Sequence, residues 1–225
     1  MKKKLWNFCR RVLSILLNLA VVWMEPTAAR LSWEAVGTQM FTFYTENSNF
    51  FTAGVCLLMA LFQLKALLTG REIPLWVKRL KFIATCCLTM TFMTVVLVLA
   101  PYCQEDGGVV FLLTASSMLY HHLLNPLCAF VSLVFLEREP RLSGRNVFCA
   151  LIPTLLYGSI AVYANVRRWI AGPYPFLLVY EQSVRQSAEW LAAIVCMNLF
   201  YAWLVWKAGG NGKKKHPGLL FRKTT

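Results

Sequence analysis

Hydrophobic residues in this chain run in long blocks that are separated by short polar stretches. A run of about 20 apolar residues is long enough to cross the hydrocarbon core of a bilayer as a helix. The pattern therefore predicts an all-α fold, a polytopic membrane bundle that forms a single domain over residues 1–225. The six predicted spans are residues 12–29, 39–66, 82–102, 109–136, 147–165 and 187–207.

The composition supports this fold class. Hydrophobic residues make up 58% of the chain. Charged residues make up only 15%, against about 25% in ordinary soluble domains. This excludes a disordered chain, a fibrous protein and most soluble enzymes. The eight cysteines show no CxxC or Cys/His spacing, so we predict small packing residues and no metal or redox site.

Positive residues alternate from one side of the predicted bundle to the other. One side holds 19 of the 23 lysines and arginines, and cytoplasmic loops are the ones that carry such an excess. We therefore predict cytoplasmic termini, and we attribute the net charge of +13 to topology and not to nucleic-acid binding. The four exceptions on the outer side are Arg30, Arg167, Arg168 and Arg185.

The first hydrophobic run allows an alternative. Lys2–Lys4, the apolar stretch from Val12 to Met24 and the small residues Thr27–Ala29 resemble a cleavable signal peptide. Cleavage would leave five spans and place the new N-terminus outside. An uncleaved first span keeps the charge pattern simpler.

Two polar clusters interrupt the apolar runs, where polar side chains tend to face the bundle interior or a cavity. In the second span, Thr45, Ser48 and Asn49 are spaced so that a helix places them on one face. Such residues also join helices or extend a helix N-terminus, without any catalytic role.

The second cluster lies in the middle of the fourth span and contains His121, His122, Asn125 and Pro126. Adjacent histidines point about 100° apart on a helix, so they cannot both face one site. Asn125 can share a face with either histidine. Pro126 predicts a loosened helix near residue 122 with a free backbone carbonyl. The alternative role of the cluster is packing between helices.

A threonine hydroxyl and an imidazole together form a nucleophile and a general base. The second and fourth spans both run from outside to inside, so they could be parallel neighbours facing one cavity. With these span limits, Thr45 and His122 differ in depth by roughly 10 Å. Helix tilt, or a second span that begins earlier, has to remove this difference.

The motif Tyr44-Thr45-x-x-Ser48-Asn49, followed by His122-x-x-x-Pro126, resembles the androgen-induced membrane hydrolases. This family includes the androgen-dependent TFPI-regulating protein and bacterial relatives. Pro153-x-x-x-Tyr157 and Pro173–Leu177 resemble the bacterial relatives too. The resemblance implies an intramembrane hydrolase whose nucleophile is Thr45 and whose base is His122. The animal members cleave fatty acid esters of hydroxy fatty acids.

We therefore expect a multi-pass esterase of the cell membrane, in a bacterium the inner membrane, that cleaves these or similar lipid esters. Its partners would be the lipid substrate and membrane lipids, with no nucleic acid, cofactor, metal or obligate protein partner. Ser48, Asn49, Asn125 and His121 are the candidates for substrate or oxyanion binding. His121 also stays open as the base. Phenylalanines of the second span would contact the acyl chains: Phe41, Phe43, Phe50 and Phe51.

Two other functions use the same residues. A small transporter or channel would use the histidines and the Asn/Ser/Thr face as a polar pathway. A structural membrane protein would use both clusters to join helices.

The charge pattern generates a topology prediction. Reporter fusions after Lys207 and within residues 103–108 are expected to report opposite sides of the membrane, because an odd number of spans separates them. Alkaline phosphatase and a cytoplasmic reporter at each position measure this. Both fusions on one side would contradict the six-span topology.

Overall fold

The computed structural model describes residues 2–105, 107–137 and 142–210. Over these residues the chain is helical, with no strand. The long helices are α1 (Lys2–Val36), α2 (Tyr44–Thr69), α3 (Leu75–Thr94), α7 (Leu151–Val166) and α8 (Val184–Ala208). The shorter elements are η1 (Gly37–Thr42), η2 (Val95–Leu99), η3 (Ala100–Cys103), α4 (Gly108–Thr114), η4 (Leu119–Leu124), α5 (Asn125–Val131), η5 (Ser132–Leu136), α6 (Arg145–Cys149) and η6 (Pro175–Leu177).

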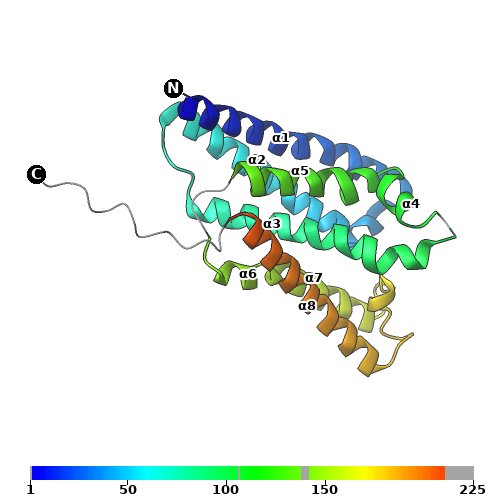
Figure 1. Cartoon of the computed structure of the whole chain (residues 1–225). Coiled ribbons are helices and arrows are strands. Elements are labelled where there is room, and N and C mark those ends of the chain that lie inside the picture. The colour runs from blue at the N-terminus through cyan, green and yellow to red at the C-terminus, as the bar shows by residue number, and fades with distance from the viewer. Residues whose placement is uncertain (1, 106, 138–141, 211–225) are drawn as a thin grey trace, which may run out of the picture.

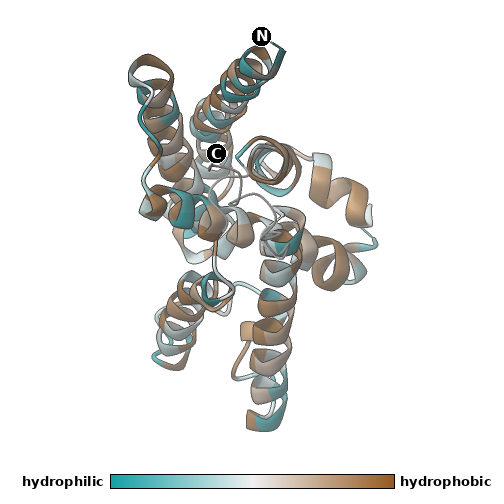
Figure 2. Ribbon diagram, turned by 60° about the vertical axis from the view of Figure 1, so that its left-hand side comes forward, coloured by the Kyte–Doolittle hydropathy of each residue, from teal (hydrophilic) through white to brown (hydrophobic). Residues whose placement is uncertain are grey.

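Within the described residues, six helical segments are long and apolar enough to cross a membrane. They are Lys4–Thr42, Tyr44–Thr69, Leu75–Cys103, Leu119–Leu136, Arg145–Val166 and Val184–Ala208. The predicted all-α membrane bundle is therefore confirmed. Hydrophobic residues cover the bodies of the helices (Figure 2), as a lipid-facing surface requires.

The start of α1, the connection between α2 and α3 and the end of α8 lie at the same end of the bundle (Figure 1). This arrangement follows the charge pattern, although which side faces the cytoplasm stays a prediction. Arg138, Arg141 and the basic residues of the tail beyond residue 210 lie outside the described residues. Thr27–Ala29 lies inside the continuous helix α1, where Ala28 is fully buried.

Near Thr45 and His122, the helices differ from the predicted spans in two places. The helix α2 begins at Tyr44 and not near residue 39, because Gly37 ends α1 with a φ of +57° and a 3₁₀ turn, η1, follows. The fourth span is broken: α4 ends at Thr114, Ser116 has a φ of +48°, and the helix resumes at Leu119. A glycine marks the first break, but no glycine marks the break in the fourth span, where the residue with positive φ is Ser116.

Pro126 has the effect that the sequence predicts. Proline lacks the N–H that would bond to the carbonyl of His122, so the helix before it cannot keep regular α-helical bonds. The chain responds with the wider π-helical turns of η4 directly upstream. Such π-helical insertions are frequent at functional sites.

A buried lysine joins several segments of the bundle through hydrogen bonds. Lys81 of α3 is fully buried, and its Nζ donates to Asn18 Oδ1 at 2.7 Å and to Cys56 Sγ at 3.0 Å. Asn18 in turn donates to Glu137 Oε1 at 2.7 Å. A buried charge is tolerated when it is paired and hydrogen-bonded. This network connects α1, α2, α3 and the end of η5.

Removing one member of the network is expected to be costly. Asn18→Leu should lower the free energy of unfolding by about 2–3 kcal/mol, because a buried cation loses a hydrogen-bond acceptor. Asn7→Leu, at an exposed position of the same helix, is the matched control. Thermal unfolding in detergent measures both, and equal midpoints for the two variants would contradict this account.

Candidate active site

Thr45 lies in the first turn of α2, where the backbone N–H groups have no partner within the helix. Phe43 is the extended residue before this turn and provides no side-chain cap. The junction is instead fixed by Asn47, whose Nδ2 donates to the carbonyls of Phe41 at 2.8 Å and Phe43 at 2.6 Å. The hydroxyl of Thr45 is thus held at a helix start and not in mid-helix.

His122 contacts Thr45 directly. Its Nε2 lies 3.4 Å from Thr45 Oγ1, and its Nδ1 lies 2.6 Å from the carbonyl oxygen of Leu112. A carbonyl only accepts hydrogen bonds, so Nδ1 carries the proton in the neutral ring. Nε2 is then the acceptor, and it faces the threonine hydroxyl. Leu112 can accept this bond because α4 ends two residues later.

The break in the fourth span also removes the difference in depth. The continuous helix around His122 begins at Leu119, close to the histidine, as α2 begins close to Thr45. Of the two expected remedies, helix tilt and an earlier start of the second span, the earlier start is wrong, because α2 begins later than predicted. Both side chains lie near the start of their helices.

Tyr174 is the third side chain at this point. Its hydroxyl accepts the N–H of Thr45 at 3.3 Å and lies 3.4 Å from Thr45 Oγ1. Burial raises the pKa of Tyr174 to about 12, so the phenol stays protonated near neutral pH. It is therefore a hydrogen-bond donor for an oxygen atom that lies close to Thr45.

The loop that carries Tyr174 is fixed by aromatic contacts. Tyr174 stacks on Phe176 with ring centroids 5.1 Å apart, and its edge meets Phe43 at 6.0 Å. Gly172 lets the loop fold tightly, since a Cβ at this position would lie 2.3 Å from the carbonyl oxygen of Leu177. The sequence motif Pro173–Leu177 marked this loop, but spacing alone assigned Tyr174 no role.

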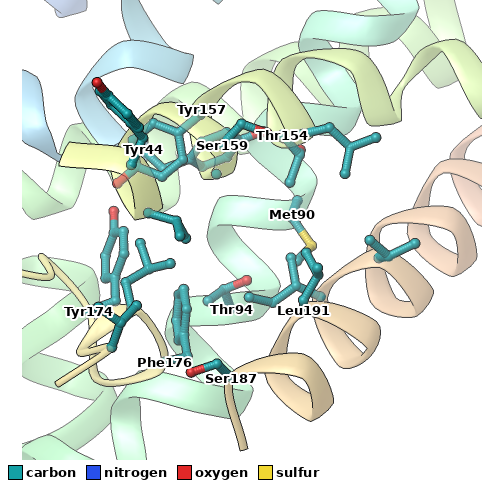
Figure 3. A pocket seen from close by; sticks show the side chains of 18 of the residues that line it. Tyr44, Met90, Thr94, Thr154, Tyr157, Ser159, Tyr174, Phe176, Ser187 and Leu191 are labelled. Atoms are coloured by element: carbon teal, nitrogen blue, oxygen red, sulfur yellow. Dashed lines mark hydrogen bonds between the residues drawn. The ribbon is translucent and has the colours of Figure 1, made fainter. Parts of the chain in front are cut away.

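A cavity of about 710 Å³ begins at Thr45 and Tyr174 and extends between α3, α7 and α8. Tyr44 and Tyr174 border one end, while Met90 and Leu191 border the other (Figure 3). None of the described residues that line it is charged, and most are apolar. Such a cavity suits a hydrocarbon chain.

The cavity is not sealed from the outside of the bundle. Leu155 and Tyr163 of α7 line it and are 41% and 57% exposed, and Leu191 of α8 lines it and is 57% exposed. These side chains lie on the two helices that spread away from the rest of the bundle (Figure 2). Exposed side chains of α7 and α8 therefore form part of the cavity wall.

Several predicted site residues do not reach this cavity. Ser48 and Asn49 donate to the carbonyl of Thr45 at 3.0 and 2.8 Å, and Asn125 donates to Glu25 and Asn49, both at 3.0 Å. Their donors are used within the bundle, so these residues do not form a polar end of this cavity. These residues hold the first turn of α2 in place.

This cavity does not lie between the second and fourth spans, where the sequence predicts one, and that prediction stays a prediction. The cavity lies on the other side of Thr45, toward α3, α7 and α8, and His122 does not line it. The phenylalanines of the second span are also outside the lining. Phe41 and Phe50 stack on each other at 5.9 Å, and both are exposed.

His121 points away from Thr45. Its Nε2 lies 3.5 Å from Glu25 Oε2, and its Nδ1 lies 4.0 Å from Glu46 Oε1. All three side chains are buried. The sequence had suggested no acidic partner for the histidines, because Glu25 comes from α1, and such a pairing between spans leaves no spacing signal.

Among the described residues, no group of three or more His, Cys, Asp and Glu side chains is arranged to hold a metal ion. Comparisons of the chain with models of protein families, with curated proteins and with solved structures found no match. The resemblance to androgen-induced membrane hydrolases stays a prediction.

The contacts of His122 predict its tautomer. In protein labelled with ¹⁵N at histidine, the neutral ring of His122 should carry its proton on Nδ1, because that atom donates to Leu112. Nitrogen chemical shifts measure this, and the spectrum of His122→Gln assigns the signals. A neutral ring that is protonated on Nε2 would contradict the proposed direction of the bond to Thr45.

Proposed function

We propose that this protein is an intramembrane lipid esterase with Thr45 as nucleophile and His122 as general base. The observation that carries the proposal is the contact of Thr45 Oγ1 with His122 Nε2 at 3.4 Å, while His122 Nδ1 is held by Leu112. A hydroxyl is a weak nucleophile until a base removes its proton. A histidine fixed through its other nitrogen is the usual base.

The reaction begins when the ester carbonyl lies beside Thr45 at the end of the cavity. Thr45 Oγ1 attacks the carbonyl carbon, and His122 Nε2 accepts the hydroxyl proton. The imidazolium then returns this proton to the leaving alcohol as the carbon–oxygen bond breaks. An acyl-threonine remains. Water attacks it with His122 again as base, which releases the acid and restores the hydroxyl.

The negative oxygen of the intermediate needs hydrogen-bond donors. Tyr174 supplies one, since its hydroxyl lies 3.4 Å from Thr45 Oγ1. When Tyr174 turns toward the substrate, the N–H of Thr45 at the start of α2 is released as a second donor. Ser48, Asn49 and Asn125 support the position of Thr45 and give no donor to the oxyanion.

The substrate class follows from the cavity. Its apolar lining and its opening toward lipid favour an ester with a long acyl chain. Fatty acid esters of hydroxy fatty acids, which the family resemblance implies, have this character, and so do related lipid esters. Cell-membrane localisation, in a bacterium the inner membrane, belongs to the same proposal.

A second candidate function is supported by His121. A buried histidine between Glu25 and Glu46 is the kind of ionisable group that marks proton pathways in transporters. Labelling with a fluorophosphonate ester probe separates the two functions, because only a hydrolase forms a covalent adduct, and it does so only with Thr45 intact.

The mechanism predicts how strongly each substitution lowers the rate of ester hydrolysis. Thr45→Ala and His122→Ala should each reduce ester hydrolysis by about 10³-fold or more, and the double variant should be no worse, since the two residues act as a unit. Tyr174→Phe should lose about 10²-fold, as for one oxyanion donor. Thr45→Ser keeps the hydroxyl and should retain activity. Hydrolysis of a panel of lipid esters by purified protein measures this.

His121→Ala is the matched comparison, because it removes the adjacent histidine without touching the bond to Thr45. It should remain more active than His122→Ala. Full activity of Thr45→Ala would overturn the threonine mechanism. An inactive His121→Ala together with an active His122→Ala would identify His121, and not His122, as the general base.

A further inference from the structure

Two adjacent arginines lie where the charge pattern predicts few positive residues. Arg167 and Arg168 follow Val166, which is the last residue of α7 and lines the cavity. Both arginines are exposed. Neither arginine lines the cavity, but both follow directly after Val166 of its wall, and nothing in the proposed hydrolysis uses them.

These two arginines differ from the other outer arginines in their partners. Arg30 pairs with Glu34 at 3.4 Å, and Arg185 pairs with Glu189 at 2.8 Å. Among the described residues, Arg167 and Arg168 pair with no carboxylate. Their guanidinium groups instead lie over the rings of Trp169 at 5.7 Å and Tyr180 at 4.7 Å. Their charges are thus placed against aromatic faces and left uncompensated.

The turn that holds Arg168 is well fixed. Arg168 has a φ of +59°, in the left-handed region where glycine is the usual residue after a helix. Its N–H donates to Asn165 O at 2.8 Å, and the buried side chain of Asn165 bonds to Ile170 and Val179. The hydroxyl of Tyr180 donates to Val166 O at 2.7 Å. These bonds fix the backbone at Arg168, two residues beyond Val166 of the cavity wall, and the guanidinium of Arg168 lies over the ring of Tyr180.

We propose that Arg167 and Arg168 bind a free carboxylate at the far end of the substrate lipid. This rests on the proposed esterase function. An arginine fork matches a carboxylate with two parallel hydrogen bonds. The uncharged cavity cannot take the carboxylate inside without a large desolvation cost. In this arrangement the ester lies at Thr45, the hydrocarbon fills the cavity, and the anionic end stays outside the cavity at the two arginines.

The same chemistry would attract the phosphate of a lipid headgroup, so the test uses a matched pair of substrates. One is an acyl ester of a long-chain hydroxy fatty acid, and the other is its methyl ester, which lacks the charge. In Arg167→Gln/Arg168→Gln, KM for the acid should rise about 10- to 100-fold, as for lost charge-assisted hydrogen bonds. KM for the methyl ester should not change. Arg30→Gln is the control and should affect neither.

An equal effect on both esters, or the same effect from Arg30→Gln, would overturn the proposal. Each assay is repeated in nanodiscs of zwitterionic lipid with and without anionic phospholipid. An effect that appears only with anionic phospholipid, for both esters alike, would assign the arginines to headgroups and not to the substrate.

A binding measurement separates this proposal from the proposed hydrolysis. Brominated fatty acid should quench the fluorescence of Trp169 in Thr45→Ala, and the double arginine variant should lose the quenching; Trp169→Phe identifies the signal. Quenching by the acid with no hydrolysis by the wild type would reject the esterase and keep the anion site. Hydrolysis with no preference for the acid would reject the anion site alone.

Discussion

A helix that ends inside an apolar bundle leaves backbone N–H and C=O groups that water does not reach. In this chain α2 begins and α4 ends inside the bundle, and side chains form hydrogen bonds with their free backbone groups. The hydroxyl of Tyr174 accepts the N–H of Thr45, and Nδ1 of His122 donates to the carbonyl of Leu112. The requirement to satisfy the backbone thus orients the side chains that we assign to catalysis. The breaks are part of the site.

The first four spans and the last two spans of the bundle differ in how much of their surface is buried. The first four spans pack closely through buried polar networks around Asn49 and Lys81, and they hold Thr45 and His122. The last two spans bury less of their length, 17% and 22% of their most hydrophobic windows against 50% for the span of α3. They supply the cavity wall that lipid can reach. The residues that we assign to catalysis thus lie in the more buried half, and the proposed path of substrate entry lies in the less buried one.

The sequence predicts the features that depend on a fixed length or a fixed period along the chain. Bilayer thickness sets the length of each span, and the helical period placed Thr45, Ser48 and Asn49 on one face. The break at Ser116 was not predictable, because no glycine marks its left-handed φ. The partner Glu25 and the place of the cavity depend on which helices become neighbours, and a linear hydropathy pattern does not contain that information.

The order of the site residues along the chain has a consequence for biosynthesis. Thr45 and His122 are 77 positions apart, and Tyr174 is 129 positions from Thr45. At roughly 5–20 residues per second, a ribosome needs several seconds to pass from the histidine to the tyrosine. During that interval a partly inserted chain holds Thr45 and His122 without Tyr174 and without the cavity wall that α7 and α8 supply. Under the proposed mechanism, the nascent chain therefore has no oxyanion donor and no lipid site until its last spans are made.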